Sequence, residues 1–347
     1  MKVIVMFGGG GALGAFDCGV WNALVPRLHE AGARLVGVGG ASIGALNAAC
    51  LARHGADLDA GARELEDLWM RQLVTPSLPV GGPAFDRDHA AFNGVMTGLL
   101  AGTRSLYRAD PMRWNPLAGM DRARQPLMDR SGMRAWLDTH IGAVSTGPDA
   151  PLLCAPAVDV DSGELVVFDS DAAPVTTEHL AASSAIPLLF DLVSIDGRTY
   201  WDGDVTREAA LPLMLDRLRA RGRIGGDGAP TLLITVDHMS RPAGRRPASG
   251  LELVHRALEL LLQGKMTPPP GSLAGIDHVI AITREAMPHD LLSGQFDYSP
   301  ERIDELVAQG RRQALCAWDA WRDGGAGAAQ GDAAGPRRGA DEARAMH

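Results

Sequence analysis

The first 53 residues alternate between short apolar runs and stretches with a helical period. Residues 2–7 form an apolar run that ends in glycine, which is typical of a short buried strand. From residue 15 onward, apolar side chains recur every four positions, which predicts a helix that Pro26 should kink or end. A second strand is expected over 34–38 and a second helix over 43–53. The apolar stripe of the first helix consists of Phe16, Val20, Leu24 and Leu28.

The order strand, helix, strand, helix with short connections favours a parallel sheet that is covered by helices. Two tight turns, at 161–163 and 196–197, are each flanked by short apolar runs and predict hairpins. Further strands are expected over 231–236 and 278–282, and further helices over 251–263 and from Ser299 onward.

Proline, glycine, methionine and arginine are frequent between residues 75 and 130, and the apolar period fades there. This composition predicts a lid-like or cap-like insertion of loops and short helices. From residue 323 the chain is rich in alanine, glycine and arginine, which is typical of a disordered tail. We therefore expect one domain over 1–322 that carries this insertion, followed by a disordered tail over 323–347.

Charge and cysteine usage narrow the class of protein. The formal net charge is −9, which argues against a nucleic-acid partner. The four cysteines lie far apart and form no CxxC pair, so neither a zinc site nor a disulfide framework is expected. The N-terminus does not resemble a signal peptide, and the uncharged segment 35–52 holds too many glycine and polar residues for a membrane span. A cytoplasmic location is expected, and secretion without a signal peptide is compatible with the sequence. The number of copies in the functional unit is not predicted.

Residues 8–14 read Gly-Gly-Gly-Gly-Ala-Leu-Gly and connect the first strand to the first helix. Successive N–H groups at a helix N-terminus favour negative charge, so this loop suits either a phosphate or an oxyanion. Residues 9–14 also fit GxGxxG, the fingerprint of dinucleotide-binding enzymes. That fingerprint needs an acidic residue at the end of the next strand, where this chain has residues 39–42, Gly-Gly-Ala-Ser. A dinucleotide-binding oxidoreductase therefore becomes the weaker alternative.

Gly40-Ala41-Ser42-Ile43-Gly44 is a GxSxG motif between a predicted strand and a predicted helix. A serine at such a turn has a strained backbone, so its neighbours two positions away on either side must be small. The turn directs the hydroxyl toward the N-terminus of the helix, where positive potential favours an alkoxide. These features predict that Ser42 is a nucleophile, with a plain tight turn as the alternative.

A nucleophilic serine needs a base. In α/β-hydrolases that base is histidine and the GxSxG turn follows several strands, whereas here it follows only one. His238, at a predicted strand end, could serve such a triad, but a polar residue at the start of a loop is the simpler interpretation. His179 is interpreted as a solvated or core histidine.

A third motif lies far downstream, at Tyr200-Trp201-Asp202-Gly203-Asp204. With the glycine loop and GxSxG in this order, the chain resembles the patatin-like phospholipase family. The similarity extends from residue 3 to about residue 320 and includes 182–187, which resembles the family's segment before the catalytic aspartate. The resemblance implies a three-layer α/β/α sandwich with a mostly parallel central sheet.

The resemblance also implies the site. Ser42 would be the nucleophile and Asp202 its base, without histidine, and no metal or organic cofactor would be needed. The oxyanion hole would consist of the N–H groups of Gly10 and Gly11, with Gly9 as a further donor. Motif support would come from Gly14, Gly40, Gly44 and Gly203.

Three positions depart from the family pattern: Leu13 stands where arginine or lysine is frequent, Asp204 where glycine or alanine is usual, and Glu208 where asparagine is common. These departures raise the alternative of low activity. Asp196 also precedes a glycine and is a minority alternative to Asp202.

The function implied is hydrolysis of a fatty acyl ester of a phospholipid, lysophospholipid or neutral lipid, with transient contact to a membrane surface. An apolar acyl channel would be built from residues 75–130 and 251–264. The alternatives are a catalytically weak or inactive lipid-binding relative and a hydrolase that uses histidine as its base.

Overall fold

The computed structural model describes most of the chain. The described residues are 1–110, 126–145, 147, 150–226, 228–239, 253, 256–257, 260, 262–269, 271–287, 289–290 and 294–324. Three predicted segments fall mainly outside them: the middle of the insertion over 111–125, most of the helix over 251–263, and the tail from residue 325.

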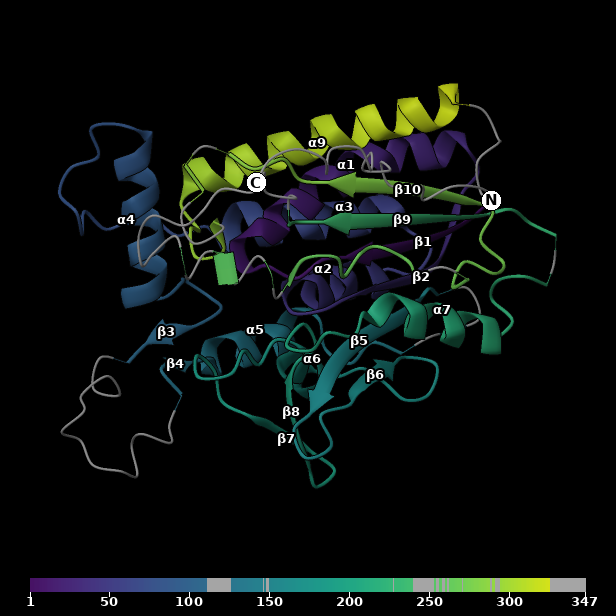
Figure 1. Cartoon of the computed structure of the whole chain (residues 1–347), viewed down its shortest axis with the longest axis horizontal. Helices are drawn as coiled ribbons and strands as arrows, with labels where there is room; N and C mark the ends of the chain where they lie inside the picture. The colour runs from purple at the N-terminus through teal and green to yellow at the C-terminus, as the bar shows by residue number, and fades with distance from the viewer. Residues whose placement is uncertain are drawn as a thin grey trace, which may run out of the picture.

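A mixed sheet of eight strands forms the centre of the molecule (Figure 1). Five neighbouring strands, in the order β10-β9-β1-β2-β5, run parallel, and β6, β8 and β7 add antiparallel pairs beyond them. The strands are β1 (Lys2–Phe7), β2 (Arg34–Gly40), β5 (Leu152–Asp159), β6 (Leu165–Asp169), β7 (Val193–Ile195), β8 (Arg198–Asp202), β9 (Thr231–Asp237) and β10 (His278–Thr283), with a separate pair β3 (Arg108–Ala109) and β4 (Met128–Asp129). The predicted mostly parallel sheet and both predicted hairpins are confirmed.

Helices cover both faces of this sheet. In β1, Val3, Val5 and Phe7 pack into a core with α1, α2 and α9, whereas Ile4 and Met6 pack into a second core with α7. Successive residues of a strand point to opposite faces, so β1 is buried on both sides, as the predicted layered fold requires. The helices are α1 (Ala15–Glu30), α2 (Ile43–Ala52), α3 (Leu58–Asp67), α4 (Arg87–Leu100), α5 (Ser131–His140), α6 (Thr177–Ser183), α7 (Ala210–Ala220) and α9 (Pro300–Asp323). Within the described ranges, no helix has both the length and the apolar character that crossing a bilayer requires.

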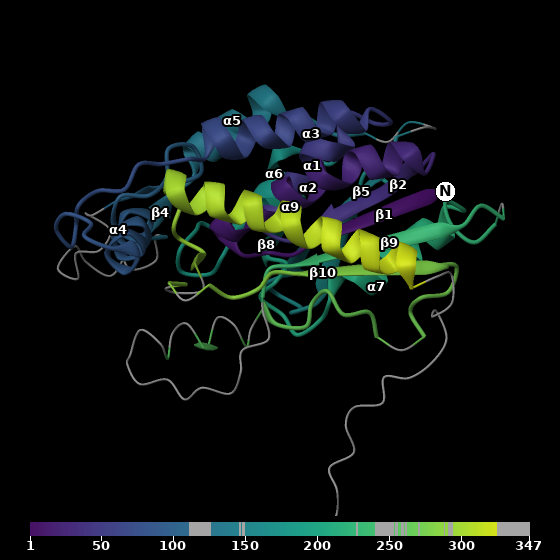
Figure 2. The same ribbon diagram turned by 90° about the horizontal axis from the view of Figure 1, so that it is seen from above.

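Helices α1 and α9 lie side by side along the sheet (Figure 2). A Cβ atom at Gly19 would lie 2.0 Å from the carbonyl oxygen of Val307, and one at Gly310 would lie 2.2 Å from that of Phe16. The two backbones are therefore in direct contact, and a side chain at either glycine would force the helices apart. The predicted start of α9 is confirmed, since Ser299 Oγ accepts a hydrogen bond from the backbone N–H of Arg302.

Two helical features differ from the sequence-based expectation. Pro26 lies inside α1, which continues to Glu30, so the proline does not end the helix. Val25 and Leu28 are buried, and their packing outweighs the hydrogen bond that a proline nitrogen cannot donate. In the insertion, α4 is 14 residues long and exceeds the short helices predicted there. Its buried positions are mainly small or polar and so produce no clear apolar period.

The carboxyl ends of the parallel strands point toward the end of the molecule that carries α4, β3 and β4 (Figure 1). The glycine loop after β1, Ser42 after β2 and His238 after β9 therefore meet at one edge. Strand β8 runs in the opposite direction, and its register places Asp202 beside them. Strands β2 and β5 run parallel, and Gly39, three residues before Ser42, pairs with Cys154. Asp202 pairs with Ala157, three residues after Cys154, so Asp202 lies level with Ser42.

Candidate active site

Ser42 occupies the sharp turn between β2 and α2 with φ 55° and ψ −127°, a conformation that is strained for any residue except glycine. The two flanking glycines make this turn possible. A Cβ at Gly40 would lie 2.5 Å from the carbonyl carbon of Gly44, and one at Gly44 would lie 2.6 Å from the carbonyl oxygen of Gly8. The Ser42 N–H donates to the carbonyl oxygen of Ser183 over 2.9 Å. The predicted elbow geometry is thus present, with the serine at the N-terminus of α2.

Asp202 ends β8 and is 2% exposed. Ser183 connects it to Ser42, because the Ser183 carbonyl oxygen accepts from both the Ser42 N–H and, over 3.3 Å, the Gly203 N–H. Asp202 Oδ1 accepts from the Asp204 N–H over 2.8 Å, whereas Oδ2 accepts no hydrogen bond from a described residue. The Ser42 hydroxyl is close enough to lower the pKa of Asp202, although it does not complete a hydrogen bond to Oδ2. The structure therefore brings the two predicted residues together with one carboxylate oxygen unused.

Burial, and after it the neighbouring charge of Asp204, raise the pKa of Asp202 to about 7. The Asp204 N–H, the Ser42 hydroxyl and the Arg130 charge act in the opposite direction. Burial also raises the pKa of Asp204, to about 6, against the charges of Lys265 and His238. A carboxyl that titrates near neutral pH can accept and return a proton during a reaction.

Asp204, one of the three departures, faces the glycine loop. A Cβ at Gly9 would lie 1.9 Å from Asp204 Oδ2 and 3.3 Å from Ser42 Cβ, so only glycine fits between them. The Gly9 N–H interacts with the Asp204 carboxylate and lowers its pKa. Of the three predicted oxyanion donors, Gly9 therefore already has an acceptor.

The other two donors are open. Gly10 and Gly11 have φ values of 148° and 57°, which favour glycine, and their N–H groups donate to no described residue. The next two N–H groups are used, since Ala12 donates to Gln295 and Leu13 to Gly10. Leu13, the second departure, is fully buried and packs against Gly10 without contributing a charge.

Lys265 reaches the site from a segment that the sequence analysis did not single out. Its ammonium donates to the backbone carbonyl oxygens of Thr206 and Glu208, the latter over 2.9 Å, and its charge lowers the pKa of Asp204. The third departure, Glu208, thus contributes its backbone to this contact. One signal was available: Lys265 is one of only two lysines in a chain with 33 basic residues.

His238 is fully buried behind the glycine loop. Its Nε2 lies 2.7 Å from Asp17 Oδ1 and its Nδ1 lies 3.1 Å from the Gly9 carbonyl oxygen. His179 instead accepts from the Thr176 N–H and is half-buried, and Asp196 lies in the exposed turn between β7 and β8. Among the described residues, no histidine hydrogen-bonds to Ser42 or Asp202.

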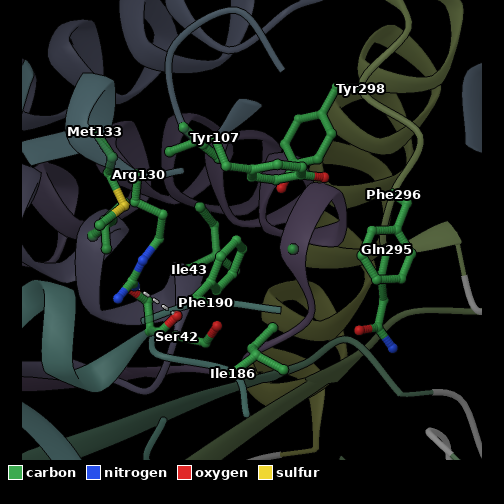
Figure 3. Close-up of a pocket in the computed structure, with 14 residues that line it drawn as sticks. Ser42, Ile43, Tyr107, Arg130, Met133, Ile186, Phe190, Gln295, Phe296 and Tyr298 are labelled. Carbon is green, nitrogen blue, oxygen red and sulfur yellow. Dashed lines mark hydrogen bonds between the residues drawn. The ribbon is translucent and has the colours of Figure 1, made fainter. Parts of the chain in front are cut away.

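An apolar pocket lies beside Ser42 (Figure 3). The residues that line it are Gly11, Ser42, Ile43, Leu46, Leu106, Tyr107, Arg130, Met133, Ser184, Ile186, Phe190, Gln295, Phe296 and Tyr298. Leu106 and Tyr107 come from the predicted insertion, and the segment 295–298 was not anticipated. No group of three metal-binding side chains occurs in the described part of the chain.

Arg130 is the charged residue of the pocket wall, and no local motif marks it. Its Nη1 donates to the carbonyl oxygens of Ala181 and Ser184 over 2.9 and 3.0 Å, and its guanidinium lies 4.7 Å from the centre of the Phe190 ring. Burial lowers its pKa to about 10, so it stays charged at neutral pH. Arg130 thus fixes the segment 181–184, whose Ser183 carbonyl joins Ser42 to Gly203.

Comparison with known proteins gives one family. A family model for patatin-like phospholipases matches residues 5–214. No curated protein sequence matches the chain. Among solved structures, VipD from Legionella pneumophila is similar with a TM-score of 0.42 and 14% identity, over 92% of this chain and 67% of that chain. The type III effector ExoU of Pseudomonas aeruginosa is similar with a TM-score of 0.35 and 17% identity, over 91% of this chain and 52% of that chain.

The chain therefore spans about two thirds of the VipD chain and about half of the ExoU chain. The segment that matches the family model covers more than half of the present chain and contains residues 8–14, Ser42 and Asp202. This protein belongs to the patatin-like phospholipase family.

Proposed function

We propose that this protein hydrolyses fatty acyl esters of lipids, with Ser42 as nucleophile and Asp202 as the base. Its family is generally one of lipid acyl hydrolases. The observation that carries the proposal is the buried Asp202 carboxyl, which lies level with Ser42, keeps Oδ2 unused and titrates near neutral pH. A buried carboxyl without a full set of partners lowers stability, which suggests a role in chemistry.

In the first half-reaction, Ser42 Oγ attacks the ester carbonyl carbon, Asp202 accepts the hydroxyl proton, and the carbonyl oxygen takes the negative charge. The open N–H groups of Gly10 and Gly11 stabilise that oxyanion, whereas the Gly9 N–H is occupied by Asp204. When the bond to the leaving alcohol breaks, Asp202 returns its proton to the alcohol oxygen. In the second half-reaction, Asp202 takes a proton from water, and the resulting hydroxide attacks the carbonyl carbon of the acyl-enzyme. The bond from that carbon to Ser42 Oγ then breaks, the fatty acid leaves, and Asp202 returns the proton to Ser42 Oγ.

The pocket supports an acyl chain as the substrate part next to Ser42. Its wall is mostly aliphatic and aromatic, and the charge of Arg130 is held by carbonyl oxygens and by Asp191. An aliphatic chain gains about 0.8 kcal/mol for each methylene it buries. A charged substituent would lose its hydration in this apolar pocket, where the charge of Arg130 is already engaged.

A surface beside the pocket suits contact with a lipid membrane. Residues 78–85 carry no charge, and Leu78 and Phe85 are 50% and 81% exposed. The buried side chain of Asn93 in α4 fixes the middle of this segment, since its Oδ1 accepts from the Gly81 N–H and its Nδ2 donates to the Gly82 carbonyl oxygen. The segment starts next to the pocket, where the Thr75 N–H donates to the carbonyl oxygen of Tyr298.

A further exposed apolar side chain, on another segment, also lies beside the pocket. Leu188 is 85% exposed and lies between Ile186 and Phe190, which both line the pocket. Its carbonyl oxygen accepts from the Leu127 N–H, which places it next to the start of β4. Exposed apolar residues on one segment beside the pocket and on one segment of its wall would bring the pocket to a bilayer surface.

Labelling with a fluorophosphonate probe tests the nucleophile, because such probes react only with an activated serine. We expect the wild-type protein to be labelled, Ser42→Ala to lose labelling, and Asp202→Asn to fold but hydrolyse a p-nitrophenyl fatty acyl ester at least about 10²-fold more slowly. Unchanged labelling of Ser42→Ala would refute the assignment. A folded wild type that is neither labelled nor active would favour the inactive lipid-binding alternative, which vesicle binding would then reveal.

A further inference from the structure

The glycine loop is held from behind by a buried polar network that the proposed reaction has not used. His238 and Asp17 are both completely buried and contact each other through Nε2 and Oδ1. The other ring nitrogen, Nδ1, faces the Gly9 carbonyl oxygen at 3.1 Å. His238 therefore connects Asp17 to the loop at Gly9, next to the predicted oxyanion donors.

The hydrogen bonds around the contact between Asp17 and His238 Nε2 can be assigned a direction. Trp69 Nε1 can only donate, and it donates to Asn47 Oδ1 over 2.9 Å. This fixes the Asn47 amide, whose Nδ2 donates to Asp17 Oδ2 over 2.8 Å and to the Gly14 carbonyl oxygen over 3.0 Å. One proton then lies between Asp17 and His238 Nε2. Whichever of the two carries it, Nδ1 keeps a hydrogen, because the Gly9 carbonyl oxygen can only accept.

The bond to Gly9 has a geometric consequence for the next residue. Gly9 C=O and Gly10 N–H belong to one peptide unit, and no peptide bond among the described residues is cis. In a trans peptide these two groups point in opposite directions. Fixing the Gly9 carbonyl on the buried side therefore turns the Gly10 N–H away from His238. Gly9 also lies against Ser42, whose Cβ would be 3.3 Å from a Cβ at this glycine.

We propose that His238 is a positioning residue that, through its Nδ1–H bond to the Gly9 carbonyl, aims the Gly10 N–H at the oxyanion formed on Ser42. The inference rests on the proposed hydrolase function and assigns a support for its oxyanion hole. Leu13 cannot supply such a support, since it is apolar and packs on Gly10 through Cβ and Cδ1. The support instead comes from the end of β9, more than 200 residues further along the chain.

The proton that the pair holds controls this bond. Burial alone would lower the pKa of His238, but the charge and hydrogen bond of Asp17 and the Gly9 carbonyl raise it overall. Burial likewise raises the pKa of Asp17, against His238. If His238 and Asp17 together lost this proton, the remaining hydrogen of the imidazole would lie on Nε2, facing ionised Asp17. The Nδ1 lone pair would then face the Gly9 carbonyl oxygen, and the hydrogen bond between them would be lost. Among the residues that the structure describes, the remaining charged groups near His238 are Asp237 on its own strand, Asp204 after β8, and Arg284 after β10, whose Nε donates to the His238 carbonyl oxygen.

Two amide variants separate aiming from packing. Asparagine can place an N–H near the Nδ1 position, whereas glutamine reaches the Nε2 position. His238→Gln should keep the contact with Asp17 and lose the one with Gly9, and His238→Asn should do the reverse. Because His238→Asn leaves Asp17 buried without its partner, it should be the less stable of the two in thermal unfolding.

Activity should follow the opposite order. For a p-nitrophenyl ester, we expect His238→Gln to lower kcat by about 10²-fold with little change in KM, and His238→Asn to retain kcat within about tenfold of wild type. If activity follows stability instead, or if both variants match the wild type, the proposal is wrong. Should His238→Asn fail to fold, Asp17→Asn combined with His238→Asn removes the unpaired charge, and the same order of kcat values applies.

A measurement without turnover separates this inference from the function on which it rests. Nitrogen NMR of histidine-labelled wild-type protein should show a hydrogen on His238 Nδ1 at neutral pH. A bare Nδ1 would overturn the positioning role even in an active enzyme. An inactive wild type with a protonated Nδ1 would instead count against the hydrolase proposal alone.

Discussion

Replacing Asp204 by asparagine should move the acid limb of the pH–activity profile toward lower pH. In the proposed mechanism, Asp202 must be deprotonated to accept the Ser42 proton, so kcat/KM rises as pH passes through its pKa of about 7. Burial is the main cause of that high value, and the negative charge of Asp204 is the second. Asp204→Asn removes the second cause and leaves the first.

The size of the change follows from Coulomb's law. For two carboxylates separated by a distance on the order of 6 Å, an effective dielectric constant of about 20 gives about 3 kcal/mol, which corresponds to about two pKa units. Lys265 acts in the same direction, because its charge would no longer be shared with Asp204. We therefore expect the acid limb to move from about pH 7 to about pH 5–6.

The assay is kcat/KM for a soluble ester between pH 5 and pH 9. Asp196→Asn is the matched control: it neutralises an exposed aspartate with positive φ, a conformation that asparagine also tolerates. This control also tests the minority alternative to Asp202, because it should leave the profile and the rate unchanged. An acid limb that stays at pH 7 in Asp204→Asn, or that moves upward, would refute the electrostatic coupling of the two carboxyls.

Three further predictions concern binding and stability. Phe85→Asp and Leu188→Asp should each weaken sedimentation with phosphatidylcholine vesicles while leaving hydrolysis of a soluble ester unchanged; equal vesicle binding would remove these side chains from the proposed contact. Asp202→Asn should raise the unfolding temperature at pH 8 but not at pH 4. Folding raises the pKa of the Asp202 carboxyl from 3.8 to about 7, so this carboxyl destabilises the folded protein increasingly as the pH rises above 3.8. An equal gain at both pH values would contradict this sign. Gly44→Ala should lower the free energy of unfolding by several kcal/mol or prevent folding, since the new Cβ would lie 2.6 Å from a backbone oxygen. Gly226→Ala is the control, because a Cβ there would meet nothing within 4 Å. Similar urea midpoints for the two variants would contradict this steric argument.

Local signals predicted those parts of the fold that depend on local sequence. Strand β1 has the predicted bounds because an apolar run next to glycine has few other solutions, and the start of α9 follows from the Ser299 cap. Pro26 shows where local rules fail. Its penalty acts on one hydrogen bond, whereas Leu28, one half-turn later, gains from a core that is assembled from distant segments.

For the site, too, the parts formed by consecutive residues could be predicted, and the contacts between distant segments could not. Ser42 and its flanking glycines could be identified because the steric demands of the turn act within five consecutive residues. The groups that set the chemistry of the turn act from far along the chain: Arg130 through the carbonyls of 181–184, Lys265 through its charge on Asp204, and His238 through the back of the glycine loop. None of these three contacts involves a recurring sequence spacing or a motif by which it could be recognised from the sequence. Leu13 packs on Gly10 through apolar atoms only, so the support that we propose for the loop comes from another strand end at the same edge of the sheet, and only the fold reveals which one.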